Sequence, residues 1–453
     1  MGKLFGTDGI RGVANVDPIS PDFVLKIGQA IGLYFKETHT HPRVLIGKDT
    51  RRSGYMLEQA LAAGICSVGV DVNFLGPLPT PGIAYLTRGL RASAGIVISA
   101  SHNPFEDNGI KIFSADGHKL PDEAENRLEA LLEDPYMASD RPKGAKIGRA
   151  KRIDDAIGQY AVFLKEQFPK VLTLDGLRLV IDCAHGAAYK VAPKVFEELG
   201  AECFLLGVEP NGSNINDNVG ALHPQKLREQ IRLYKADMGI ALDGDADRLV
   251  AIDDRGEVLD GDEILAICGA KLAKAGMLRH NTVVCTVMSN LGLDLALEKV
   301  GVKTMRSKVG DRYVMEEMLK GSYSLGGEQS GHLIFKDCAT TGDGILAALK
   351  LLAIMVEEQA PLSKLRKIID KFPQVLRNVP VRKKVPLEQV PQLQELIKNM
   401  ENKLGKNGRM LFRYSGTESL ARIMIEGQDA LLINSLAEEL AHHTAKTLAQ
   451  QND

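Results

Sequence analysis

The chain lacks tryptophan, has few cysteines and carries no excess of charge of either sign. Its 56 lysines and arginines nearly balance 58 aspartates and glutamates, which gives a formal net charge of −2. A general nucleic-acid binder needs a basic surface, so this balance argues against that class while still allowing a local basic pocket for a small anion. The six cysteines form no CxxC pair, and in a chain of 453 residues they are expected to be reduced.

Long hydrophobic runs are also missing. The longest apolar stretch, Ile345–Val356, contains Lys350 and is too short to span a bilayer. The residues around Phe5 do not have the pattern of a signal peptide. The sequence therefore predicts a cytoplasmic protein whose partners include neither a membrane nor a nucleic acid.

The chain does contain a repeated alternation of strand-like and helix-like stretches. Short β-branched apolar runs are followed by turn residues and then by segments with helical spacing, which is typical of βαβ units. We predict three similar α/β domains with mixed sheets, at residues 1–150, 151–254 and 255–370. A smaller α+β domain is predicted at residues 371–453.

A serine-containing loop follows one buried strand of the first predicted domain. Ala94–Ile98 predicts the strand, and Ser101-His102-Asn103-Pro104 together with the later Asn108-Gly109 are turn signals. Functional sites in open α/β sheets lie beyond the carboxyl ends of strands, so Ser101 is a candidate nucleophile or phosphate carrier. Taken alone, the stretch favours a turn that caps local backbone.

Three carboxylates, Asp243, Asp245 and Asp247, lie two residues apart directly after another predicted strand. Hard oxygen ligands of this kind suit Mg²⁺ or Ca²⁺, and Mg²⁺ commonly completes its shell with phosphate oxygens. An EF-hand does not fit, because Arg248 stands where that loop needs glycine. The alternative is a solvated acidic turn.

Two further loops have the composition of binding sites. One combines hydroxyls, a glycine and guanidinium groups that can cradle a phosphate: Arg413, Ser415, Gly416, Thr417 and Arg422. The other places an acceptor and a hydroxyl two residues apart, at Glu328 and Ser330, so that an extended loop would turn both toward sugar hydroxyls. A Ser/Thr turn and a glycine-bracketed turn are the respective alternatives. Together the four loops favour an enzyme that moves a phosphoryl group on a sugar.

These motifs, in this order, resemble the α-D-phosphohexomutase superfamily along nearly the whole chain. Ser101–Pro104 resembles its phosphoserine loop, Asp243–Arg248 its metal loop, Glu328–His332 its sugar loop and Arg413–Thr417 its phosphate loop. The opening Phe5–Gly12 and Gln329 resemble the branch that acts on glucosamine phosphates. Ser419 departs from the pattern, because the family usually has proline there.

The resemblance implies that phosphorylated Ser101 exchanges its phosphoryl group with a hexosamine phosphate through a sugar bisphosphate. It implies a Mg²⁺ held by Ser101 and the three aspartates, and a homodimer. Lys111, Arg11 and His102 are the implied general acid/base candidates, and His332 is expected to contact substrate. Asp311 follows Val309-Gly310 where the mannose and glucose branch has histidine.

The implied reaction interconverts glucosamine 6-phosphate and glucosamine 1-phosphate. The alternatives are a phosphomannomutase/phosphoglucomutase of the same fold and, more remotely, a sugar-phosphate-binding or Ca²⁺-binding protein without turnover.

Overall fold

The computed structural model describes residues 4–6, 8–382, 384–414 and 419–450. The chain folds into two compact units. The first comprises Met1–Thr286 and Met305–Lys367, and the second comprises Val287–Thr304 and Ile368–Asp453.

The first sheet of the first unit has six strands and is mixed. Its order is β1 (Ile10–Val13), β5 (Asp107–Ser114), β4 (Ala94–Ile98), β2 (Arg43–Lys48), β3 (Asp71–Pro77) and β6 (Ala150–Arg152). The strands β4, β2, β3 and β6 run parallel, whereas β5 is antiparallel to both β4 and β1. The carboxyl ends of β2 and β4 therefore meet at one edge, directly before the predicted serine loop.

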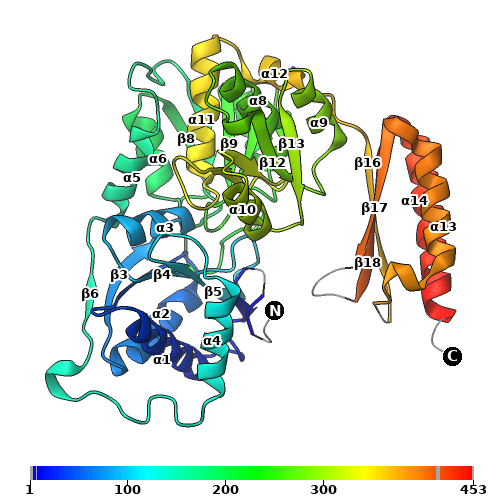
Figure 1. Cartoon of the computed structure of the whole chain (residues 1–453). Helices are drawn as coiled ribbons and strands as arrows, with labels where there is room; N and C mark the ends of the chain where they lie inside the picture. Colours follow the sequence, from blue (N-terminus) through cyan, green and yellow to red (C-terminus); the bar gives the residue numbers. More distant parts are fainter. Residues whose placement is uncertain (1–3, 7, 383, 415–418, 451–453) are drawn as a thin grey trace. The chain divides into compact units, whose positions relative to one another are not determined.

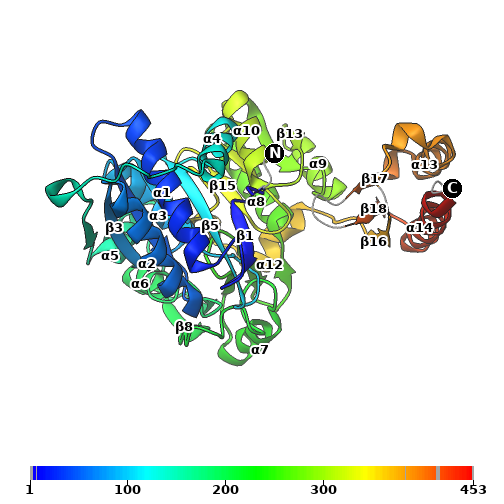
Figure 2. The ribbon, with the colours of Figure 1, turned by 90° about the horizontal axis from the view of Figure 1, so that it is seen from below.

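Helices cover both faces of this sheet (Figure 1). They are α1 (Pro21–Thr38), α2 (Arg52–Ser67), α3 (Thr80–Gly89) and α4 (Asp122–Glu133). Helix α1 begins where the Ser20 side chain accepts a hydrogen bond from the Phe23 amide, with Pro21 in the first turn. Figure 2 confirms that α1 and α2 lie side by side, whereas α3 packs on β2 and β4.

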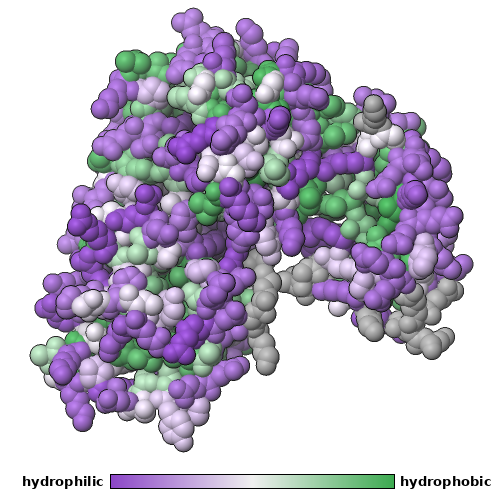
Figure 3. Space-filling view, in the orientation of Figure 1, coloured by the Kyte–Doolittle hydropathy of each residue, from purple (hydrophilic) through white to green (hydrophobic). Residues whose placement is uncertain are grey.

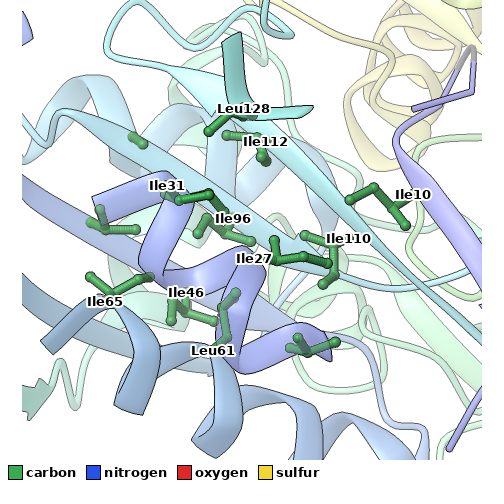
Figure 4. Close-up of a cluster of buried hydrophobic side chains, with 14 of the residues drawn as sticks. Ile10, Ile27, Ile31, Ile46, Leu61, Ile65, Ile96, Ile110, Ile112 and Leu128 are labelled. Atoms are coloured by element: carbon green, nitrogen blue, oxygen red, sulfur yellow. The ribbon is translucent and has the colours of Figure 1, made fainter. Parts of the chain in front are cut away.

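The core of this layer is aliphatic (Figure 4). Ile27 and Ile31 are one helical turn apart on α1 and are fully buried against the sheet. The sheet contributes Ile46, Ile96 and Ile110, each with no exposed surface. Burial of one such side chain stabilises the fold by about 1.5–3 kcal/mol, so this layer is a rigid support for the loops at its edge.

The first unit contains two further, smaller sheets, in one of which strand β13 (Lys303–Ser307) begins two residues before this unit resumes at Met305. One has the order β11 (Val258–Leu259), β10 (Leu249–Asp253), β9 (Met238–Leu242), β7 (Arg178–Asp182) and β8 (Glu202–Leu206). The other has the order β13 (Lys303–Ser307), β12 (Thr282–Thr286), β14 (Leu325–Gly327) and β15 (Leu333–Phe335). The connecting helices are α5 (Ala156–Glu166), α6 (Val191–Glu198), α7 (Gln225–Tyr234), α8 (Gly261–Lys274), α10 (Asp311–Lys320), α11 (Gly344–Glu358) and α12 (Leu362–Leu365).

The second unit contains an antiparallel three-stranded sheet with the order β16 (Gln374–Pro380), β18 (Leu420–Gly427) and β17 (Gly408–Tyr414). Helices α13 (Pro391–Leu404) and α14 (Ala430–Gln450) lie on the same face of that sheet in both ribbon views. Helix α9 (Leu291–Glu298) also belongs to this unit. Asn290, directly before α9, joins this helix to the unit, because its side-chain amide group exchanges two hydrogen bonds of 3.0 Å with the backbone of Phe372.

The predicted class, three α/β layers with mixed sheets followed by a smaller α+β part, is confirmed. The expected turn at Asn108-Gly109 was wrong, because both residues lie inside β5. A Cβ at position 109 would lie 2.8 Å from the carbonyl oxygens of Ile10 and Ser99. Glycine is needed there for close backbone approach, not for a turn.

The sequence has no long apolar runs, and neither the helices of the described residues nor the face drawn in Figure 3 shows a feature that would require one. No helix in the described part of the chain is long and apolar enough to cross a bilayer. Hydrophilic side chains predominate on the face shown in Figure 3, and apolar areas on it are small and scattered.

Candidate active site

Ser101 lies three residues beyond the end of β4, in a left-handed backbone conformation with φ of +52°. Its side chain is buried, and its Oγ donates a hydrogen bond of 2.6 Å to Oδ2 of Asp243. The Ser101 amide donates to Oγ of Ser99 at 2.9 Å. The fold thus brings the predicted serine onto the first of the three predicted metal ligands, from 142 positions away in the sequence.

The shape of this loop depends on Arg51, which has no exposed surface. Its guanidinium group pairs with Asp49, and its Nη2 donates to the carbonyl oxygens of Asn103 at 2.5 Å and Ser101 at 3.3 Å. Asp49 in turn accepts a hydrogen bond of 2.6 Å from Ser99 Oγ. A buried ion pair therefore holds the backbone on both sides of Ser101.

The three aspartates form a buried cluster in the turn between β9 and β10. Each is at most 5% exposed, and each offers a carboxylate oxygen within 4.8 Å of those of the others. Burial raises the pKa of Asp243 to about 8, and the charges of Asp247 and Asp245 add to the effect. Such a cluster favours the binding of a cation, because a cation removes the mutual repulsion.

The donor atoms of the cluster fit a divalent metal ion. Oδ1 of Asp245 and Oδ1 of Asp247 are buried and have no hydrogen-bond partner among the described residues. Unsatisfied buried carboxylate oxygens are costly, and hard oxygen donors of this kind are what Mg²⁺ and Ca²⁺ coordinate. The three aspartates can therefore hold a metal ion next to Ser101.

Lys111 projects from β5 onto the same cluster and is 2% exposed. Its Nζ lies 2.9 Å from Asp245 Oδ2, 3.1 Å from Asp8 Oδ2 and 3.5 Å from Asp247 Oδ2. Burial would lower the pKa of Lys111, but the charges of Asp245, Asp8 and Asp247 outweigh it and hold this pKa well above its usual value. Lys111 is therefore a permanent positive charge beside the cluster.

His102 and Arg11, the other two acid/base candidates, lie close to this arrangement. His102 Nδ1 is 3.3 Å from Ser101 Oγ. Burial, followed by the charges of Arg248 and Arg11, lowers the pKa of His102 to about 4, so its ring is neutral at pH 7. Arg11 lies on β1 and pairs with Asp8, which also contacts Lys111.

The Glu328–His332 segment is a tight connection between β14 and β15, not the extended loop that the spacing of Glu328 and Ser330 assumed. The Gly331 amide closes a turn onto the Glu328 carbonyl oxygen at 3.0 Å. Glu328 is half-buried and accepts a hydrogen bond from the Gly310 amide, and Ser330 is exposed. His332 is buried, with Nδ1 3.6 Å from Asp247 Oδ1. The sugar loop therefore directly adjoins the metal loop.

The predicted phosphate loop lies in the second unit. Arg413 on β17 and Arg422 on β18 are directly opposite each other in the antiparallel ladder. Burial and the charge of Arg422 lower the pKa of Arg413. Ser415, Gly416 and Thr417 lie outside the described residues.

Comparison with protein families now identifies the chain. Four models of the phosphoglucomutase/phosphomannomutase family match it in order: α/β/α domain I at residues 2–137, domain II at 159–256, domain III at 260–372 and the C-terminal domain at 376–443. The chain belongs to the phosphoglucomutase/phosphomannomutase family. Its curated relatives place it in the phosphoglucosamine mutase branch, among enzymes of the isomerase class. The phosphoglucosamine mutase of Citrifermentans bemidjiense is 56% identical over 448 residues, which cover 99% of each chain.

Solved structures of other phosphohexomutases share the fold. A phosphoglucomutase/phosphomannomutase family protein from Burkholderia thailandensis has a TM-score of 0.80 at 23% identity, with 97% of each chain covered. An N-acetylphosphoglucosamine mutase from Aspergillus fumigatus, in complex with GlcNAc-6P and magnesium, has a TM-score of 0.66 at 17% identity, covering 98% of this chain and 96% of that chain.

Several residues that shape this candidate site were not found from the sequence. They are Asp8, Asp49, Arg51, Thr80, Lys119 and Asn216. Thr80 Oγ1 donates to Asp245 Oδ2 at 2.6 Å, and Asn216 donates to the Ser101 carbonyl oxygen at 2.9 Å. Two signals could have been used: Asp8 lies inside the Phe5–Gly12 motif, and Asp49-Thr50-Arg51 places charged residues directly after a predicted strand.

Proposed function

We propose that the chain interconverts glucosamine 6-phosphate and glucosamine 1-phosphate, with Ser101 as the phosphoryl carrier. The observation that supports this most directly is the hydrogen bond from Ser101 Oγ to Asp243 inside a buried cluster of three aspartates. A serine turn that merely caps backbone has no need of a nearby metal site. The amino sugar is chosen because relatives that match nearly the whole chain carry the name phosphoglucosamine mutase.

In this proposal Asp243, Asp245 and Asp247, together with an oxygen on Ser101, hold Mg²⁺. A bound Mg²⁺ would neutralise charge on the transferring phosphoryl group. Support comes from the two unsatisfied aspartate oxygens and from the Aspergillus relative, whose structure contains magnesium.

The reaction consists of two phosphoryl transfers. In the first, the bond between phosphorus and Ser101 Oγ breaks as phosphorus bonds to the free hydroxyl oxygen of the sugar phosphate, and the hydroxyl proton passes to a general base. The sugar bisphosphate then turns over. In the second transfer, the bond between its other phosphorus and the sugar oxygen breaks as that phosphorus bonds to Ser101 Oγ, and the proton held by the general base passes to the freed sugar oxygen. We assign proton transfer to the set Lys111, His102 and Arg11, in which the neutral His102 ring can accept the hydroxyl proton, whereas the positively charged Lys111 and Arg11 can donate hydrogen bonds to the reacting oxygens. A trace of the bisphosphate would serve as activator.

Substrate binding is divided between the two remaining loops. Glu328, Ser330 and His332 are proposed to contact the sugar, and Arg413, Arg422 and the Ser415–Thr417 segment to hold the distal phosphate. The predicted domains at 1–150, 151–254, 255–370 and 371–453 would then carry the phosphoserine, metal, sugar and phosphate loops respectively. A phosphorylated sugar does not cross a bilayer unaided, which supports the predicted cytoplasmic location; a homodimer stays a prediction.

The test is a competition assay with Mg²⁺ and a trace of sugar bisphosphate, in which glucosamine 6-phosphate, glucose 6-phosphate and mannose 6-phosphate are supplied at equal concentration. We expect the amino sugar to react at least tenfold faster, which corresponds to about 1.4 kcal/mol at the transition state. Ser101→Ala should abolish turnover, whereas Ser139→Ala, at an exposed serine, should leave it unchanged. Equal rates for the neutral sugars would reject the assignment of glucosamine phosphate as the preferred substrate. Turnover by Ser101→Ala would reject Ser101 as the phosphoryl carrier.

A further inference from the structure

Six ionisable side chains form a closed ring in which acidic and basic groups alternate, and one of them, His332, also accepts a hydrogen bond of 3.0 Å from the Gly342 amide at its Nε2. Lys119 Nζ lies 2.6 Å from Asp8 Oδ1 and 2.5 Å from Asp311 Oδ2. Asp311 Oδ2 then faces His332 Nε2 at 3.7 Å, and His332 Nδ1 faces Asp247 Oδ1 at 3.6 Å. Lys111 closes the ring, 3.5 Å from Asp247 Oδ2 and 3.1 Å from Asp8 Oδ2.

The ring joins three separate parts of the family fold. Asp8, Lys111 and Lys119 fall in the segment matched by domain I, Asp247 in domain II, and Asp311 and His332 in domain III. None of the six side chains is more than 24% exposed. Partial burial strengthens attraction between opposite charges and makes the loss of any one of them costly.

Lys119 is the basic member of the ring that contacts none of the proposed metal ligands, whereas Lys111 and His332 both lie against Asp247. It neutralises two carboxylates at once, and the charges of Asp311 and Asp8 raise its pKa although burial lowers it. Without this ammonium group, Asp8 and Asp311 would face each other as two negative charges on opposite sides of a gap. Asp8 would then shift together with Lys111 and Arg11, and Asp311 would shift away from His332.

We propose that Lys119 is a positioning residue of the phosphoryl transfer. Through Asp8 it holds Lys111, and through Asp311 it holds His332, so that these two side chains stay against the aspartate cluster. This inference rests on the proposed function. It assigns Lys119 no contact with substrate, metal or the phosphoryl group.

Lys119 is not needed to hold the domain I segment against the domain III segment, because other contacts join these two segments. Arg312 pairs with Asp122 at 2.5 Å and with Glu125 at 3.1 Å, and Thr340 donates to the Gly117 carbonyl oxygen at 2.6 Å. A pocket of about 210 Å³ is lined by Lys119, Asp311 and His332, so this side of the ring borders a cavity and not a packed core. Removal of the Lys119 charge should therefore disturb the ring locally and leave the fold intact.

The experiment compares single-turnover rates of the full chain carrying Lys119→Met, Lys119→Arg or Lys271→Met. Lys271 is the matched control, because it also bridges two carboxylates, Glu357 and Glu358, and is 24% exposed where Lys119 is 19% exposed. Each variant is phosphorylated with sugar bisphosphate, and the phosphoserine content is measured by mass spectrometry. The rate of transfer to glucosamine 6-phosphate is then expressed per phosphorylated chain, which removes any loss of active protein.

We expect Lys119→Met to lower this rate at least tenfold with a change in KM of less than threefold. Lys119→Arg should recover the rate to within threefold of wild type, and Lys271→Met should stay within twofold. In an Asp311→Asn background, Lys119→Met should cost less than it does alone, because the two residues act as one unit.

A Lys119→Met rate per phosphorylated chain within twofold of wild type would overturn the inference. The inference would also be overturned if the rate losses of Lys119→Met and Asp311→Asn multiplied in the double variant. The proposed function fails separately, and is tested first, if the wild-type chain carries no phosphoryl group on Ser101 or does not transfer it.

Discussion

Arg51→Met is the substitution whose consequences the structure defines most sharply. The side chain is fully buried and paired with an equally buried Asp49, so its removal leaves an uncompensated carboxylate in the interior. Breaking a buried pair by removing one partner costs about 3–5 kcal/mol. Burial already raises the pKa of Asp49 while Arg51 lowers it, so the variant should raise this pKa further. The carbonyl oxygens of Ser101 and Asn103 also lose their shared donor.

The assay is hydrogen exchange of the Ser99–Pro104 segment in the intact chain. A loss of about 3–5 kcal/mol makes opening of this loop more frequent by about two to four powers of ten. Arg52→Met is the matched control, because Arg52 is the exposed neighbour and should change local stability by about 0.5 kcal/mol or less. Arg51→Lys, which keeps the charge but not the planar fork, should be intermediate. If exchange and turnover in Arg51→Met matched those of Arg52→Met, the reasoning would be refuted.

Three further predictions concern the metal, the pH dependence and the sugar loop. Mg²⁺ at about one hundred times its Kd should stabilise the first unit by about 2.7 kcal/mol, seen as a rise in melting temperature that a chelator reverses and Asp245→Asn abolishes. Burial raises the pKa of Asp343 to about 6, so the folded chain binds this proton more tightly than the unfolded chain, and stability is lost as pH rises from about 4 to about 6. Asp343→Asn should therefore be more stable than wild type at pH 7, by up to about 3 kcal/mol, and similar at pH 4; a calorimetric scan at both values checks this. Gly261→Ala would place a Cβ 2.0 Å from the Glu328 carbonyl oxygen, so it should raise KM for the sugar phosphate at least tenfold without changing the Mg²⁺-dependent melting shift.

The sequence could point to a candidate loop where its chemistry is one contiguous motif. Ser101–Pro104 and Asp243–Arg248 could be recognised because their chemistry is concentrated in a few neighbouring residues. The strand Ala94–Ile98 was predicted correctly, because a short buried strand reads as a continuous apolar run. Asn108-Gly109 was misjudged because its glycine serves the approach of neighbouring strands, which local turn preferences cannot express.

Local pattern thus determined the α/β class and the identity of the four candidate loops, since periodicity and motif spacing are properties of neighbouring residues. Only the tertiary structure decided which charges surround Ser101. Lys111 meets Asp245 across 134 positions, and Lys119 meets Asp311 across 192. Such pairs leave no periodic trace, because an ion pair needs only proximity in space. The buried Arg51–Asp49 pair was hidden for another reason: its residues are only two positions apart in the sequence, but their burial follows from the sheet that packs around them.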